Sequence, residues 1–386
     1  MHFPSLIVAL SSTLLIVQAH PGHDINHEIG QRAKALGHNP RDISHCSAKL
    51  KVRGHEDRTI NRRSALLKAE REKRSLATDP SFIKARDMDT RLDDRDAATV
   101  LNTNHLSPVV YTPHTDTDIV FAGNQSCILV PEVTEGPYYV SGEFIRSDLR
   151  ETDHEQGVDL ILDIQVIDVS TCEPVPDIMV DFWHANSTGV YSGVIAGSNG
   201  NSADASNINT THSRGLQPTD IDGVAQFTAF YPGHYTGRTH HIHVATHANG
   251  TILPNNTFAG TAVSHIGQLF FDQALSTQVE ATSPYSSNTQ PLTTNAQDGI
   301  FAQAAAVGDP VVEYSLLSAD VKDGIFAWIA FGIDTSRQEA IQAAVVYGEN
   351  GGVANSNGGG GPGGPPSGFP TRTRTSTGAA ATLTTF

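Results

Sequence analysis

The segment from Gly233 to Val244 contains His241 and His243, two histidines separated by a single residue. On an extended strand, residues two apart project from the same face, so both imidazoles would lie together while Ile242 points to the opposite face. Such a pair supplies half of a four-ligand metal site, and the fold must then bring the other ligands to this face. The alternative is a polar strand in a surface sheet, because His-x-His pairs also occur by chance.

The composition of the 386-residue chain favours a fold rich in strands and loops. Charged residues are only 17% of the total, and segments with helical periodicity are scarce. Short apolar or alternating segments between Gly, Pro and Asn turns predict a mainly β fold, an antiparallel β-sandwich core with long loops. The predicted strands are 158–168, 178–183, 224–230, the His-x-His strand, 268–271, 311–316 and 324–333. The net charge of −16 argues against nucleic acid as a partner, because no basic surface is available to neutralise phosphates.

The amino-terminal residues have the pattern of a secretory signal peptide. An apolar run from Leu6 to Val17 precedes Val17-Gln18-Ala19, a small-residue pattern that predicts cleavage after Ala19. This run is too short to span a bilayer, and no later segment is long and apolar enough for a transmembrane helix. We therefore expect a secreted, extracellular protein.

Five Asn-x-Ser/Thr sequons agree with secretion, because such sites are glycosylated in secreted proteins. The four that we expect to be candidates for glycosylation are Asn124, Asn209, Asn249 and Asn255. The fifth, Asn186, lies inside a motif described below.

The chain divides by composition into four parts. The predicted parts are a signal peptide at 1–19, a charged N-terminal arm or propeptide at 20–115, a β-sandwich at 116–345 and a disordered tail at 346–386. The tail is rich in Gly, Pro, Ser and Thr and cannot bury a core. Within the arm, Ala65 to Arg74 is rich in helix formers and ends in the dibasic pair Lys73-Arg74. Two interpretations remain open: a propeptide cleaved at this pair, or a partly helical arm that docks on the domain.

Three cysteines are present, Cys46, Cys127 and Cys172. In an oxidising compartment two of them should pair. Cys127 and Cys172 both lie in the predicted folded part, so we predict a disulfide between them, which leaves Cys46 free or removed with a propeptide. No Cys-x-x-Cys pattern occurs, which argues against a zinc cluster.

Further motifs occur in a fixed order on both sides of the predicted strands. They are Glu135-Gly136-Pro137-Tyr138-Tyr139, then Trp183-His184-Ala185-Asn186 with Gly189-x-Tyr191, then Pro232-Gly233-x-Tyr235 with Arg238-x-x-His241-x-His243. With these motifs the chain resembles the intradiol ring-cleavage dioxygenases over roughly residues 120 to 335, and most of all their secreted fungal members. The ordered set of two tyrosines, one arginine and two histidines is far more specific than any single motif.

The resemblance implies that Tyr191, Tyr235, His241 and His243 are the ligands of a non-haem Fe(III). The chemistry of these donors agrees with that implication. A free phenol has a pKa of about 10, but a bound cation favours its ionised form. Two phenolates are hard anionic donors that stabilise ferric iron, and two neutral imidazoles complete the set.

The resemblance also implies roles for residues around the metal. Arg238 would stabilise negative charge that develops on the substrate, and Gln268 would be its partner. Tyr235 would be the ligand that the substrate displaces and the base that takes a substrate proton. Tyr138 would line the substrate pocket. The implied partners are a catechol-type aromatic and dioxygen, and the ring would open between its two hydroxylated carbons to a cis,cis-muconate-type product.

Two other functions compete with this one. The first is a non-catalytic secreted metal-binding β-sandwich module associated with the cell wall, which keeps the iron site as a relic or uses it for other metals. The second is a copper oxygenase that uses His20, the residue exposed by signal cleavage. The family's Arg-Pro-Ala-His reads Arg238-Thr239-His240-His241 here, and the dimerising helical linker of bacterial members is not evident, so the oligomeric state stays open. His184, His234, His240 and His247 are expected to be structural or surface residues.

Overall fold

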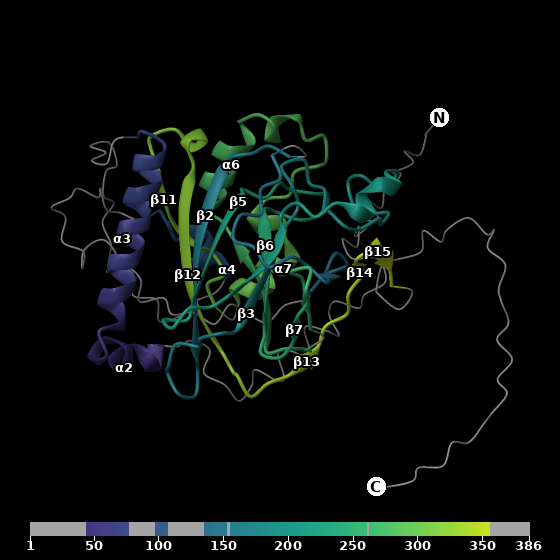
Figure 1. Cartoon of the computed structure of the whole chain (residues 1–386). Helices are drawn as coiled ribbons and strands as arrows, with labels where there is room; N and C mark the ends of the chain where they lie inside the picture. Colours follow the sequence, from purple (N-terminus) through teal and green to yellow (C-terminus); the bar gives the residue numbers. More distant parts are fainter. Residues whose placement is uncertain are drawn as a thin grey trace, which may run out of the picture.

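The structure, a computed structural model, describes residues 44–76, 97–106, 135–152, 155–260, 262–306 and 308–355. The predicted signal peptide, His20, Asn124 and Cys127 lie outside these residues. In the described part the chain is mainly β with few helices, which confirms this much of the predicted fold class (Figure 1). None of the described helices is long and apolar enough to cross a bilayer.

Most of the described strands gather in two sheets of four strands each. The strands are β1 (Val140–Ser141), β2 (Asp159–Asp168), β3 (Met179–Trp183), β4 (Arg214–Pro218), β5 (Val224–Phe230), β6 (His241–His247), β7 (Thr251–Ile252), β8 (Phe258–Ala259), β9 (Ala262–Val263), β10 (His265–Phe270), β11 (Glu313–Leu316), β12 (Ile325–Ile333), β13 (Glu339–Ala340), β14 (Val345–Gly348) and β15 (Gly351–Ala354). The α-helices are α2 (Ser47–Val52), α3 (His55–Lys73), α4 (Ala97–Asn102), α6 (Gln273–Glu280) and α7 (Gly299–Ala305). Short 3₁₀ turns are η1 (Ser44–Cys46), η2 (Ala205–Asn209), η3 (Tyr285–Ser287), η4 (Asn295–Gln297) and η5 (Val321–Asp323).

The two large sheets differ in strand direction. The first, which we name the site sheet, has the order β10-β6-β3-β4 and is antiparallel throughout. The second, the arm sheet, has the order β11-β12-β2-β5, and its central pair β12–β2 is parallel, with Ile325 opposite Leu160. The predicted antiparallel pairing is therefore confirmed for the other strand pairs of the two large sheets and is wrong for β12–β2. Alternating apolar residues show which face a strand buries, but they do not give the direction of its neighbour.

One hydrophobic cluster contains side chains from both sheets. It includes Leu162 and Ile164 of β2 and Ile242 and Val244 of β6, all fully buried. Because side chains alternate along a strand, burial of Ile242 in this cluster places His241 and His243 on the other face of the site sheet. A slip of one residue in β6 would put the imidazoles into the apolar cluster, so hydrophobic burial determines the register.

Helix α3 packs against the arm sheet along its length (Figure 1). Its Ile60 and Leu67 share a buried cluster with Phe326 and Trp328 of β12. Two of its arginines also bind a carboxylate inside this contact. Arg63 Nε donates to Asp163 Oδ1 at 2.8 Å and Arg62 Nε to Asp163 Oδ2 at 3.0 Å, and the Asp163 side chain has no exposed surface.

The electrostatics of this ion pair are set by two opposing effects. Burial raises the pKa of Asp163, but the guanidinium groups of Arg63 and Arg62 outweigh it and hold the pKa below its usual value. The carboxylate therefore stays ionised in the interface between α3 and β2.

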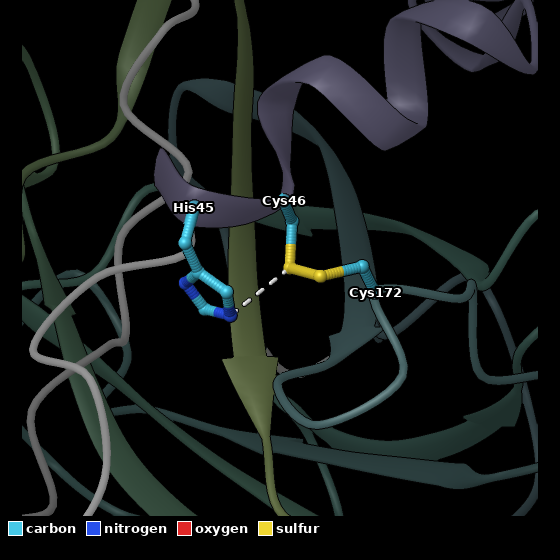
Figure 2. Close-up of side chains that lie close together, drawn as sticks. All are labelled: His45, Cys46 and Cys172. Atoms are coloured by element: carbon cyan, nitrogen blue, oxygen red, sulfur yellow. Dashed lines mark hydrogen bonds between the residues drawn. A yellow bond between two sulfur atoms is a disulfide. The ribbon is translucent and has the colours of Figure 1, made fainter.

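The disulfide differs from the predicted one. Cys46, at the end of η1, is bonded to Cys172, in the turn after β2, with their Cα atoms 5.2 Å apart (Figure 2). The predicted Cys127–Cys172 pair is wrong, because Cys172 already has its partner. Docking of α2 and α3 on the arm sheet brings η1 to this turn, although Cys46 and Cys172 are 126 residues apart in the sequence. The number and order of the cysteines do not predict this proximity. His45 Nε2 lies 3.3 Å from Cys46 Sγ and 2.9 Å from Val169 O.

The carboxyl-terminal boundary also differs from the prediction. Strands β14 and β15 form an antiparallel hairpin, and β14 pairs in parallel with β1. Residues 346–355, which we assigned to the disordered tail, are therefore part of a small sheet. Their glycine-rich composition hid the strands, because β14 pairs with β1, about 200 residues earlier, and β15 pairs with β14.

We predict that Asp163→Asn destabilises the protein by about 3–5 kcal/mol, because it leaves two arginines facing a buried site without a charged partner. Thermal unfolding of the purified protein measures the change. Because the folded pKa of Asp163 lies below its unfolded value, its stabilising effect is present above the unfolded pKa of about 4 and is lost as the pH falls through the folded value. The variant should therefore lose less stability on acidification than the natural protein.

The matched control is Asp177→Asn, at an exposed aspartate with a φ of 58°, a conformation that asparagine tolerates. Equal melting temperatures for Asp163→Asn and the natural protein would show that the ion pair does not stabilise the docked helix.

Candidate metal centre

The structure brings the four predicted ligands together on one face of the site sheet. His241 and His243 begin β6, Tyr191 lies in the loop after β3, and Tyr235 lies in the loop between β5 and β6. The pairing of β3 with β6 places Trp183 opposite His243, so the chain leaves β3 beside the imidazoles and reaches Tyr191 shortly afterwards. All four ligand side chains are at most 2% exposed.

The donor atoms are spaced as ligands of one ion would be. Tyr191 Oη lies 3.2 Å from His241 Nε2 and 3.1 Å from His243 Nε2, and Tyr235 Oη lies 3.5 Å from His241 Nε2. Two donors bonded to one ion at about 2.1 Å, with an angle of about 90–110° between the bonds, are about 3.0–3.4 Å apart. The four side chains therefore surround a position that fits a single metal ion.

Neighbouring groups orient both imidazoles. His241 Nδ1 lies 2.6 Å from the carbonyl oxygen of Thr239, which can only accept a hydrogen bond. Nδ1 therefore carries the proton, and the lone pair of Nε2 points at the two phenols, as metal binding requires. The ring of His243 stacks on Trp183 with centroids 4.9 Å apart and planes 11° from parallel.

The two phenols need a cation if they are to ionise at neutral pH. Burial raises the pKa of Tyr191 well above its usual value of 10. Burial also raises the pKa of Tyr235, although the nearby guanidinium of Arg238 opposes that shift. A bound metal ion would supply the missing positive charge, and the phenolates formed would suit a hard ferric ion.

Arg238 lies beside the ligands and is held on three sides. Its Nη1 donates to Tyr235 Oη at 3.4 Å, and its Nη2 donates to Gln268 Oε1. Its Nε donates to Asp298 Oδ2 at 2.9 Å. The predicted partnership of Arg238 with Gln268 is thus present in the structure, with Gln268 on β10 directly opposite His243.

Asp298 is a residue of the site that sequence reasoning missed. Its Oδ2 also accepts from Thr239 N at 2.9 Å, while its Oδ1 accepts from the amides of Ile300 and Phe301 in the first turn of α7. The sequence Asp298-Gly299 before an apolar segment is a helix-start signal that could have identified the cap. Its second role, as counter-ion to Arg238, depends on a contact across 60 residues and has no local signal.

Tyr138, predicted to line the substrate pocket, packs on the two candidate tyrosine ligands. Its ring stacks on Tyr191 at 4.4 Å and meets the ring of Tyr235 edge-on at 5.9 Å. Its hydroxyl lies 2.7 Å from Ser198 Oγ. It therefore restricts the movement of both phenols.

The four histidines expected to be structural or surface residues are buried and lie apart from the ligand donors. His184 Nδ1 lies 2.7 Å from Ala185 O, and His247 Nε2 lies 3.1 Å from Asp181 Oδ2. His234 and His240 both contact Glu280. Among the described sequons, Asn209, Asn249 and Asn255 are exposed, whereas the Asn186 carboxamide accepts hydrogen bonds inside its own turn. Glycosylation stays a prediction.

A separate polar groove of about 780 Å³ borders the Tyr191 loop. Its lining includes Asn186, Thr188, Asn288 and Gln290, and none of the four ligands. Several of these side chains form hydrogen bonds within the protein, so the residues that line the groove support the Tyr191 loop.

Comparison with known proteins matches residues 134–273 to the family model described as Dioxygenase. Among solved structures, an intradiol ring-cleavage dioxygenase from Tetranychus urticae is 30% identical, over 55% of this chain and 98% of that one, with a TM-score of 0.46. The dioxygenase domain of a dioxygenase–carbohydrate-binding protein fusion from Streptomyces sp. SirexAA-E is 24% identical, over 53% of this chain and 98% of that one, with a TM-score of 0.34.

A catechol 1,2-dioxygenase from Acinetobacter sp. ADP1, inhibited by bound mercury, is 20% identical, over 56% of this chain and 65% of that one, with a TM-score of 0.33. No curated protein sequence matches the chain.

We predict that the metal-free protein binds one ferric ion per chain and acquires a visible tyrosinate-to-iron charge-transfer band. Tyr191→Phe removes a phenolate donor that lies within 3.2 Å of both imidazoles. Loss of a residue that only hydrogen-bonds to a metal ligand typically weakens metal binding by ~10–100-fold. Loss of Tyr191 itself should weaken iron binding by more than this and should reduce or shift the charge-transfer band. Iron analysis and visible absorption measure both effects.

Tyr347→Phe is the matched control, because this tyrosine is half-buried and lies outside the ligand set. Equal iron content and equal spectra in Tyr191→Phe and the natural protein would exclude Tyr191 as a ligand.

Proposed function

This chain belongs to the intradiol ring-cleavage dioxygenases, and we propose that it is a non-haem Fe(III) enzyme that opens catechol-type rings. Family membership, predicted from the motifs, is confirmed by the Dioxygenase model over residues 134–273 and by 30% identity across 98% of the Tetranychus enzyme. The observation that carries the ferric proposal is the convergence of two phenols and two imidazoles within 3.1–3.5 Å of one another. A tyrosine-rich donor set favours iron(III) over the softer divalent metals.

Tyr191, Tyr235, His241 and His243 would hold the ferric ion, which would supply an electron-withdrawing centre that makes a bound catechol reactive toward dioxygen. The carbon–carbon bond between the two hydroxylated carbons breaks, and both atoms of dioxygen enter the product, a cis,cis-muconate. The reaction therefore needs no external reductant. The remaining tasks fall to the side chains around the metal.

Tyr235 is the ligand best placed to receive a proton from the substrate. Its oxygen accepts a hydrogen bond from Arg238 Nη1 at 3.4 Å. Burial raises the pKa of Tyr235 and the Arg238 guanidinium opposes that rise, so a bound metal ion and this cation together would favour the phenolate that accepts the proton.

Arg238 is positioned to stabilise negative charge on the reacting substrate. Asp298 and Gln268 hold the guanidinium in one orientation, so it need not reorganise during the reaction. It is buried, and a buried cation acts more strongly than one in water.

We propose further that the protein works outside the cytosol, as a member of the secreted branch. The Cys46–Cys172 disulfide supports this location, because such bonds persist in oxidising compartments. The predicted signal peptide supports the same location.

Oxygen uptake by the iron-loaded protein tests the function directly. We expect uptake with at least one of catechol, hydroxyquinol, protocatechuate and caffeate, together with a muconate-type product identified by mass. A fully iron-loaded protein that consumes no oxygen with a wide range of catechols would instead be a non-catalytic metal-binding module.

Arg238→Lys should retain iron and colour but lower kcat by about 10²–10³-fold, because the shorter cation cannot contact Tyr235, Gln268 and Asp298 together. Steady-state kinetics on the substrate found above measure the loss. Arg58→Lys, at a half-exposed arginine on α3, is the control and should leave kcat unchanged. A normal kcat in Arg238→Lys would exclude charge stabilisation by this residue.

A further inference from the structure

A second group of side chains lies directly behind the ligand-bearing loop. Glu280, at the end of α6, has one oxygen, Oε1, that lies 2.6 Å from His234 Nδ1 and 2.6 Å from His240 Nε2. His234 is the residue before Tyr235, and His240 is the residue before His241. One carboxylate oxygen thus joins the two ends of the loop that carries Tyr235.

The spacing of this group indicates hydrogen bonding and not a second metal site. Donors 2.6 Å apart on an ion with bonds of about 2.1 Å would subtend only about 76°, well below tetrahedral or octahedral angles. The donors of the iron centre, in contrast, lie 3.1–3.5 Å apart. Glu280 with its two histidines is therefore a support of the loop.

Gln290, which follows η3, extends this support to the other tyrosine ligand. Its Nε2 donates to the carbonyl oxygens of Thr188 at 3.0 Å and Gly189 at 3.2 Å, just before Tyr191. Its Oε1 accepts from Thr236 N at 3.2 Å, and its backbone oxygen lies 3.0 Å from His234 Nε2. Gln290 thus contacts both chain neighbours of Tyr235 and the loop that leads into Tyr191.

The two tyrosine loops also touch directly, with no space for a side chain between them. Gly189 has a φ of 78°, and a Cβ there would overlap the carbonyl oxygen of His234 and the Gln290 amide. A Cβ on Gly233 would overlap the carbonyl oxygen of Asn186. The Gln290 amide therefore lies where the two tyrosine-bearing loops meet.

We propose that Gln290 is a positioning residue that sets the placement of Tyr191 relative to Tyr235 around the metal. A carboxamide is suited to this task because its nitrogen donates to two carbonyls while its oxygen accepts from an amide. A carboxylate at this place would point acceptors at the carbonyls of Thr188 and Gly189, and an apolar side chain would leave all three backbone groups without this partner. The role at the metal rests on the proposed ferric site, whereas the bridge between the loops does not.

The test compares Gln290→Glu and Gln290→Met in the full chain with Gln278→Glu, an exposed glutamine on α6 whose Nε2 donates to Ala274 O of the same helix. In the iron-loaded protein we expect the charge-transfer band to move and iron affinity or kcat to fall about 10–100-fold in both Gln290 variants, with Gln278→Glu unchanged. The methionine variant keeps the length of the side chain and introduces no charge, so it serves if the glutamate variant does not fold. A lowered melting temperature with an unchanged band and unchanged kcat would overturn the proposal and leave Gln290 a structural residue only.

A second measurement uses metal-free protein. Hydrogen exchange at the Thr236 amide should be faster in Gln290→Met than in the natural protein, because this amide loses its acceptor. Unchanged exchange would overturn the proposal whether or not iron binds. If the natural protein binds iron but consumes no oxygen, the proposed function fails, while the band shift and the exchange rate still decide the role of Gln290.

Discussion

Burial of Ile242 and Val244 between the two large sheets determines where the metal donors lie. Because successive side chains of a strand point to opposite faces, placing these two residues in the apolar cluster turns His241 and His243 to the other face. The energy comes from the hydrophobic effect, at about 25 cal/mol for each Å² of apolar surface removed from water. The apolar core stabilises the register of β6 whether or not a metal is bound, and this register places the two candidate imidazole ligands.

Polar groups on the site face need compensation, since most of them are fully buried. Arg238 would be costly to bury alone, and Asp298 offsets that cost while four donors satisfy the carboxylate itself. The same carboxylate caps α7, so the helix and the guanidinium hold each other in place. Behind the loop, Glu280 and Gln290 satisfy backbone and imidazole groups in the same way. The site is thus supported by polar contacts that each have a second structural role.

The N-terminal helices are bound to the arm sheet by apolar packing, by the buried Asp163 ion pairs and by one disulfide. These contacts bear on the two interpretations of the arm. A cut after Arg74 would leave α2 and α3 covalently attached, because Cys46 is bonded to Cys172 of the core. Processing at the dibasic pair would then produce two chains joined by a disulfide, and α3 would remain packed on the arm sheet.

The sequence by itself determined the features that depend on local order along the chain. Seven of the eight strands in the two large sheets, the shared face of His241 and His243, and the ordered motifs that name the candidate ligands could be predicted, because alternation and spacing encode them, whereas β4 was not predicted. Tertiary structure alone decided the parallel pairing of β2 with β12, the partner of Cys172, and the contacts of Asp298 and Gln290 with the site. Each of these joins residues more than 50 positions apart. Their pairing follows from how the sheets, the arm and the loops pack together, and no local pattern of residues carries that information.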